Sequence, residues 1–100
     1  MARKVIWSVH ASEQLKDTLS YWNKRNGSNY YSNRLYQESK MALVFVANFP
    51  RLGKSTNDPN VRRIVVDKKY GIYFSIETDA IYVKLWRSLK MNPNENDYEK

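Results

Sequence analysis

Three alternating apolar stretches between Val61 and Pro93 restrict the fold of this chain most strongly. In each stretch apolar residues recur at every second position, which is the pattern of a β-strand with one buried face. Turn-rich segments separate the stretches, so they predict three consecutive strands joined by tight turns. If the apolar sets face one core, the opposite face receives a group of cationic and aromatic side chains, namely Arg63, Tyr73, Tyr82, Lys84 and Trp86.

The first half of the chain predicts a strand followed by two helices. Lys4–Val9 alternates and indicates a short first strand. A helical period then begins with Ser12 as the predicted N-cap, and it ends at Gly27, where glycine accepts the left-handed conformation of a helix C-cap. The second helix starts at a cap provided by Ser28 or Asn29.

The second helix ends before Pro50, because a proline disfavours helical backbone in the residue that precedes it. Two amphipathic helices joined by a short turn indicate an antiparallel helical hairpin. The predicted fold is therefore α+β, in the order β-α-α-β-β-β, with the hairpin packed on one face of a largely antiparallel four-stranded sheet. Residues 50–60 predict a loop without the glycine pattern of a nucleotide-binding P-loop. We expect one domain over residues 1–91 and a polar, flexible tail over residues 92–100.

The balance of charge indicates a polyanionic partner. The formal net charge is +7, and residues 1–90 carry 16 Lys and Arg against 7 Asp and Glu. Such a surface attracts RNA, DNA or an acidic protein. The chain has no cysteine and a single histidine, His10, so we expect no metal site and no cofactor. No apolar run is long enough to cross a bilayer, which favours a cytoplasmic protein without a membrane partner.

Seven short segments carry recognisable motifs, and they are Trp7 in the first strand, Tyr21–Gly27, Asn48–Gly53, Arg62–Val66, Tyr70–Phe74, Asp79–Val83 and Leu85–Pro93. Their order and spacing resemble the RelE/ParE superfamily, the toxins of type II toxin–antitoxin modules, which are also called plasmid-stabilisation proteins. The resemblance extends over nearly the whole chain. It implies a small basic toxin that a cognate antitoxin, encoded beside it, holds inactive.

The resemblance also implies two classes of target. RelE-like members are mRNA interferases that cut messenger RNA in the ribosomal A site, whereas ParE-like members inhibit DNA gyrase. The chain is therefore expected to arrest growth by acting on translation or on gyrase. A homodimer is a further candidate assembly.

The candidate catalytic residues are Arg63 and Arg87, since RNA cleavage of this kind needs cations that stabilise the charge developing on the phosphate. Arg87 matches a late arginine of the family, although strict alternation puts it on the core side, so it must follow a bulge or the last paired residue. Gly71 stands where the ribonucleases of the family often carry an arginine, which weakens the interpretation as a metal-independent, ribosome-dependent endoribonuclease. The candidate residues for binding nucleic acid or the target are Arg51, Lys54, Arg62, Tyr73, Tyr82, Lys84, Trp86 and Lys90.

The residues leave the question of enzymatic activity open. A different class of function is a non-catalytic basic module that binds nucleic acid or an acidic protein. An acidic antitoxin would lie along the helices or add a strand to the edge of the sheet.

Overall fold

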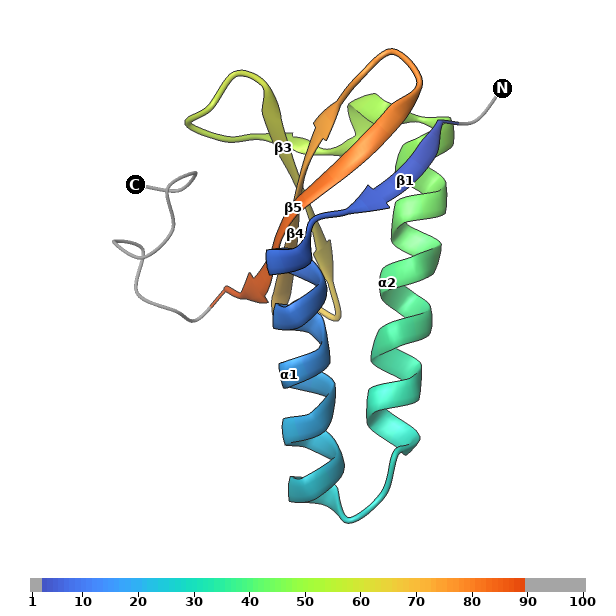
Figure 1. The fold of residues 1–100 in the computed structure, drawn as a ribbon, viewed down its shortest axis with the longest axis vertical. Coiled ribbons are helices and arrows are strands. Elements are labelled where there is room, and N and C mark those ends of the chain that lie inside the picture. Colours follow the sequence, from blue (N-terminus) through green and yellow to red (C-terminus); the bar gives the residue numbers. More distant parts are fainter. Residues whose placement is uncertain (1–2, 90–100) are drawn as a thin grey trace.

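The computed structural model describes residues 3–89, apart from the side chain of Pro50 (Figure 1). The chain forms, in order, β1 (Lys4–Trp7), α1 (Val9–Asn26), α2 (Tyr30–Asn48), the 3-10 helix η1 (Pro50–Leu52), β2 (Lys54–Ser55), β3 (Val61–Val66), β4 (Tyr70–Ile76) and β5 (Ala80–Ser88). This order confirms the predicted α+β class. The predicted tail, residues 92–100, lies outside the described residues, as does Lys90.

The strands form one mixed five-stranded sheet in the order β1-β5-β4-β3-β2. β1 runs parallel to β5, and the other neighbouring pairs are antiparallel. The prediction of four strands is wrong, because the stretch that was expected to be a loop contains the short strand β2. Lys54 and Ser55 pair with Arg63 and Arg62, and two residues are too few for an alternating pattern to identify a strand.

Ser8 joins β1 directly to α1. Its backbone N–H donates a hydrogen bond to the Val83 carbonyl of β5 at 2.9 Å, and its Oγ accepts one from the Ala11 backbone N–H at 3.0 Å. The predictions of a strand as far as Val9 and of an N-cap at Ser12 are therefore wrong. One residue completes the strand and caps the helix, so no separate turn is needed between them.

The two helices form the predicted hairpin. α1 ends at Gly27, whose φ of 66° is the left-handed conformation expected for this cap. α2 follows Asn29 and ends at Asn48, before Pro50. Figure 1 shows the helices side by side along one side of the molecule, with the sheet packed against them at one end. Between the layers lies a core built from residues of both helices and of β3, β4 and β5, including Ala11, Leu15, Leu35, Leu43, Val66, Tyr70, Ile72, Val83 and Trp86.

A bulge in β5 reverses the alternation of its side chains. Tyr73 pairs with Leu85 and the next residue, Phe74, pairs with Val83, so Lys84 is an extra residue on β5. Before the bulge, Val83 faces the helices. After it, Trp86 faces the helices, where strict alternation would have put Leu85.

Aromatic side chains connect the far end of the sheet to the hairpin. The Trp22 indole N–H donates to the Tyr70 hydroxyl at 2.7 Å, and the Tyr70 ring stacks on Trp86 with 4.7 Å between centroids. The Tyr31 hydroxyl donates to the Asp67 carboxylate at 2.6 Å. These rings pack between the layers, as the helical spacing of Trp22 and Tyr31 predicts.

Candidate functional site

The face of the sheet opposite the helices, called here the distal face, holds most of the predicted site residues. Paired residues of neighbouring antiparallel strands point to the same face. The register therefore aligns Lys54 of β2, Arg63 of β3, Tyr73 of β4 and Leu85 of β5 in one row across this face. Arg87 lies two pairs further along, opposite Gly71. The bulge thus places Arg87 on the same face as Arg63, as its candidate role required.

Gly71 leaves space that its neighbours on the distal face occupy. A Cβ atom on Gly71 would lie 2.9 Å from Leu89 Cδ2, 3.2 Å from Tyr73 Cε1 and 3.4 Å from Arg63 Cδ. These distances bring Arg63, Tyr73 and Leu89 together over the backbone of Gly71, beside Arg87. We call Arg63, Gly71, Tyr73 and Arg87 the arginine cluster. The space beside Gly71 is thus filled by side chains from β3, from β4 and from the residue that follows β5.

The side chains of the arginine cluster are buried or half-buried. Tyr73 is 1% exposed and Arg87 is 8% exposed. Tyr73 packs with Val61 and Leu85 in a small apolar cluster on the distal face. Arg63 is half-buried, and Lys54 at the sheet edge is exposed. A ligand on this face therefore meets Lys54 and Arg63 more readily than Tyr73 or Arg87.

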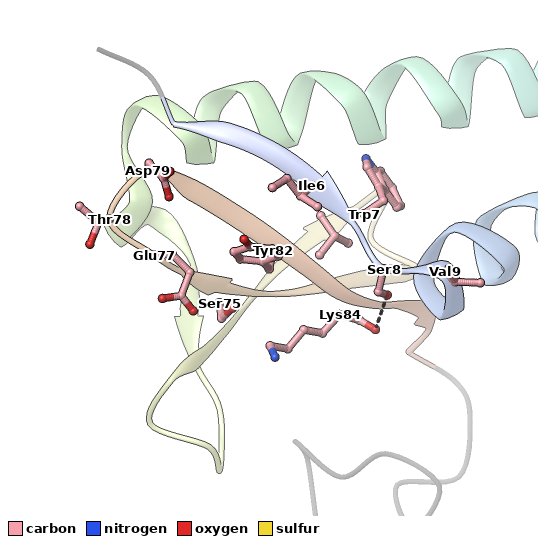
Figure 2. Close-up of a pocket in the computed structure, with 11 residues that line it drawn as sticks. Ile6, Trp7, Ser8, Val9, Ser75, Glu77, Thr78, Asp79, Tyr82 and Lys84 are labelled. Atoms are coloured by element: carbon pink, nitrogen blue, oxygen red, sulfur yellow. Dashed lines mark hydrogen bonds between the residues drawn. The ribbon is translucent and has the colours of Figure 1, made fainter.

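A second part of the distal face is a cleft of about 840 Å³ that extends to the β1 edge (Figure 2). Its lining includes Tyr82 and Lys84 of β5, Ile6 of β1 and Ser75 of β4. Figure 2 shows the Tyr82 and Lys84 side chains leaving β5, with Glu77 and Asp79 on the turn that connects β4 and β5. Tyr82 is 41% exposed, so its ring is available to stack against a ligand.

The cleft combines opposite charges with an apolar floor. Lys84 supplies an ammonium group, whereas Glu77 and Asp79 bring carboxylates to the other end of the lining. The hydroxyl oxygen of Ser75 is buried and has no hydrogen-bond partner in the described structure. Ser75 and Glu77 were not among the predicted site residues, because their residue types alone give no reason to include them. A cleft of this composition fits a protein surface of mixed charge as well as it fits a nucleotide.

Three predicted binding residues do not lie on the distal face. Trp86 is 0% exposed, and its indole N–H donates to Ser39 Oγ on α2 at 3.1 Å, so the expectation that it lies on the open face is wrong. Arg62 lies on the other side of β3 from Arg63, and its guanidinium donates to the Gly53 carbonyl at 2.7 Å. Arg51 is an exposed residue of η1. The remaining candidate, Lys90, lies outside the described residues.

The described residues suit the binding of anions better than acid–base chemistry. Arg63 and Arg87 lie on the same face of the sheet, and guanidinium groups favour phosphate or carboxylate ligands. His10 lies in the first turn of α1, outside the lining of the cleft. In residues 3–89 there is no group of three His, Cys, Asp or Glu side chains suited to a metal ion. Across the same residues, no helix is both long and apolar enough to span a membrane.

Comparison with known proteins shows the fold. No protein-family model matches the sequence, and no curated protein matches it significantly. The structure is similar to a solved chain described as "Chromosomal ParDE TA system from P. aeruginosa", with a TM-score of 0.73 and 12% sequence identity. The similarity covers 89% of this chain and 98% of that chain. The chain therefore shares the fold of a component of a ParDE toxin–antitoxin system, which supports the resemblance seen in the sequence.

Proposed function

We propose that this chain is the toxin of a type II toxin–antitoxin module and that it acts on its target by binding, without cutting RNA. The observation that carries the proposal is the similarity in fold to the ParDE component over 89% of the chain. The basic composition agrees with it, since a toxin of net charge +7 attracts an acidic antitoxin.

Within this class, inhibition of DNA gyrase is favoured over cleavage of messenger RNA. Cleavage needs a group that activates the ribose 2′-hydroxyl and cations that reach the phosphate. Arg87 and Tyr73 are buried, and Gly71 supplies no side chain at the centre of the arginine cluster. The exposed side chains of Tyr82 and Lys84 in the cleft suit the recognition of a target surface.

Expression of the chain from an inducible promoter, without its partner gene, tests the proposal. We expect growth arrest, accumulation of protein-linked linear DNA in the presence of gyrase, and intact messenger RNA. Cuts aligned with codons in translated RNA would instead identify an mRNA interferase. Normal growth at a high yield of folded protein would leave the non-catalytic binding module as the better explanation.

Two variants of the cleft locate the activity. Lys84→Glu and Tyr82→Ala alter exposed side chains, so both variants are expected to fold. Each should raise the inducer concentration needed for growth arrest by about tenfold or more, because it removes a contact at the centre of the proposed surface. Lys16→Glu on α1 is the matched control, since it makes the same change of charge on the hairpin.

The proposed antitoxin is an acidic protein encoded by a gene next to this one. Its co-expression should restore growth, and the two proteins should co-purify. A neighbouring gene product that neither binds nor protects would contradict the toxin–antitoxin part of the proposal, whatever the target proves to be.

A further inference from the structure

A row of three aromatic rings connects α1 to α2 near the tip of the hairpin. The Tyr21 and Trp22 rings of α1 lie edge to face with 5.1 Å between centroids, and Trp22 lies edge to face with Tyr31 of α2 at the same distance. Trp22 and Tyr31 are half-buried, whereas Tyr21 is 53% exposed. The row therefore ends in an exposed ring that its neighbours hold in place.

Cations lie against this row of rings. The Arg25 guanidinium carbon is 5.9 Å from the centroid of the Trp22 ring, and Arg25 Nη1 donates to the Tyr21 hydroxyl at 3.5 Å. Lys69 Nζ, on the turn between β3 and β4, is 5.9 Å from the centroid of the Tyr31 ring. Arg25 and Lys69 are both exposed, so the rings and the cations share one surface.

The turn between β3 and β4 adds a second lysine. Asp67 and Lys68 have φ of 53° and 57°, in the left-handed region that glycine and asparagine prefer. The Asp67 carboxylate accepts from the Tyr31 hydroxyl at 2.6 Å and lies 3.6 Å from Arg34 Nη2, so its charge is compensated. Lys68 and Lys69 are exposed beside it. The turn therefore presents two cations next to the rings.

The composition of the hairpin tip favours a ligand with phosphates and bases. Residues 18–37 contain three Lys and Arg and no Asp or Glu. The exposed large apolar side chains in this range are all tyrosines, namely Tyr21, Tyr30 and Tyr36. A surface that enters a bilayer carries Leu, Phe or Trp instead, whereas exposed rings among cations bind unpaired bases and their phosphates. Figure 1 shows that the tip projects beyond the sheet, so an extended ligand can reach it.

The surface that these contacts define is called here the hairpin band, and it consists of Tyr21, Trp22, Arg25, Tyr31, Lys68 and Lys69. We propose that the hairpin band binds single-stranded nucleic acid, with a base stacked on the Tyr21 ring and phosphates bound by Arg25 and the two lysines. Stacking on a side chain needs a base that is free of its partner strand, which favours single strands over duplexes. The inference goes beyond the proposed function, because it concerns another surface and another ligand.

The test is the fluorescence anisotropy of a labelled single-stranded DNA of about 20 nucleotides, titrated with the full chain. Tyr21→Ala should weaken binding by about tenfold, since it removes one stacked base. Lys68→Gly combined with Lys69→Gln should lower the slope of log affinity against log salt concentration by about 1.4, as expected for two lost phosphate contacts. Glycine suits the left-handed backbone of residue 68, so this variant should keep its fold.

Tyr36→Ala and Lys40→Gln are the matched controls. Lys40 Nζ lies 5.3 Å from the centroid of the Tyr36 ring, and Tyr36 is 40% exposed. The pair thus repeats the contact of Lys69 with Tyr31 further along α2, outside the hairpin band. Each control should bind within about threefold of the wild type, because charges at a distance are screened by salt.

Three outcomes would overturn the inference. The first is a wild type that does not bind the single strand, and binding to anionic phospholipid vesicles alone would then assign the hairpin band to a membrane. The second is binding that the hairpin-band variants leave unchanged, and a loss with Lys54→Glu would then place the nucleic acid on the distal face. The third is equal affinity for a duplex of the same sequence that Tyr21→Ala does not alter, because no base would then stack on the tip. None of these results affects the proposed function, which growth arrest and the antitoxin test separately.

Discussion

The indole N–H of Trp86 donates a 3.1 Å hydrogen bond to the hydroxyl of Ser39, which connects β5 to α2 in the centre of the core. Ser39 Oγ in turn donates to the Leu35 carbonyl at 2.9 Å. The Trp86 ring also stacks on Tyr70. Trp86 is therefore a core residue that holds the sheet to the hairpin, and its ring does not contribute to the surface that meets a ligand.

Trp86→Phe should reduce stability without changing target binding. The variant loses the hydrogen bond to Ser39 and leaves a cavity, so we expect the free energy of unfolding to fall by about 2–3 kcal/mol. Tyr82→Ala, which truncates an exposed ring on the same strand, should cost less than about 1 kcal/mol. Urea unfolding measures both values. A larger effect of Trp86→Phe than of Tyr82→Ala on target binding per folded molecule would contradict the placement of the two rings.

A side chain at residue 71 would crowd Leu89 and Tyr73, so Gly71→Ala should destabilise the fold by about 1–2 kcal/mol. The exposed Leu89 can turn away, whereas the buried Tyr73 has less freedom. In a Leu89→Ala background the cost should therefore be smaller by about 0.5 kcal/mol or more, and a double-mutant cycle measures this coupling.

Gly53→Ala provides the comparison for Gly71→Ala. A Cβ on Gly53 would lie 2.5 Å from Phe74 Cζ and 2.9 Å from Arg62 Cβ. Since Phe74 is fully buried, Gly53→Ala should be the more destabilising of the two substitutions. The reverse order would show that the distal face around Gly71 is packed more rigidly than the core around Phe74.

The sequence predicted the fold class, both helices and the three long strands because their apolar periodicity extends over six residues or more. It did not predict β2, whose two residues are defined only by pairing with β3. It also placed Trp86 on the wrong face. A single extra residue, Lys84, shifts the register of β5, and neither its type nor its neighbours differ from those of a regular strand.

The alternating pattern also predicted part of the candidate site. Alternation assigned Arg63, Tyr73 and Tyr82 to one face correctly, because β3, β4 and the first part of β5 are regular. Lys84, the extra residue of the bulge, also lines the cleft on that face. It could not predict that Tyr73 is buried there with Val61 and Leu85. That burial depends on contacts between strands, which a one-dimensional pattern does not contain.

Ser8→Ala should destabilise the protein more than Ser12→Ala. Ser8 Oγ accepts the Ala11 backbone N–H and donates to the Lys84 carbonyl at 3.3 Å. Its loss should lower the free energy of unfolding by about 1–2 kcal/mol, as for other N-caps. Ser12 lies inside the first turn of α1, so alanine there should be within about 0.5 kcal/mol of the wild type. Thermal or urea unfolding of both variants measures the difference, and equal effects would contradict the cap at Ser8.

The contact between Tyr31 and Asp67 should make stability fall at alkaline pH. Burial, and then the hydrogen bond to Asp67, raise the pKa of the Tyr31 phenol above its usual value. The unfolded chain loses this proton near pH 10, whereas the folded protein keeps it to higher pH. The contribution of Tyr31 is therefore complete below about pH 10, and it is lost as the pH rises further.

Tyr31→Phe tests this pH dependence. At about pH 8 the variant should be less stable by about 1–2 kcal/mol, because Asp67 loses a hydrogen bond. Between about pH 10 and pH 11.5 the difference in free energy of unfolding from the wild type should shrink, since the variant has no phenol to ionise at this position. Tyr30→Phe removes an exposed phenol from the same helix and serves as the control. A difference between wild type and Tyr31→Phe that stays constant from pH 8 to pH 11.5 would show that the folded protein does not hold the Tyr31 proton more tightly than the unfolded chain does.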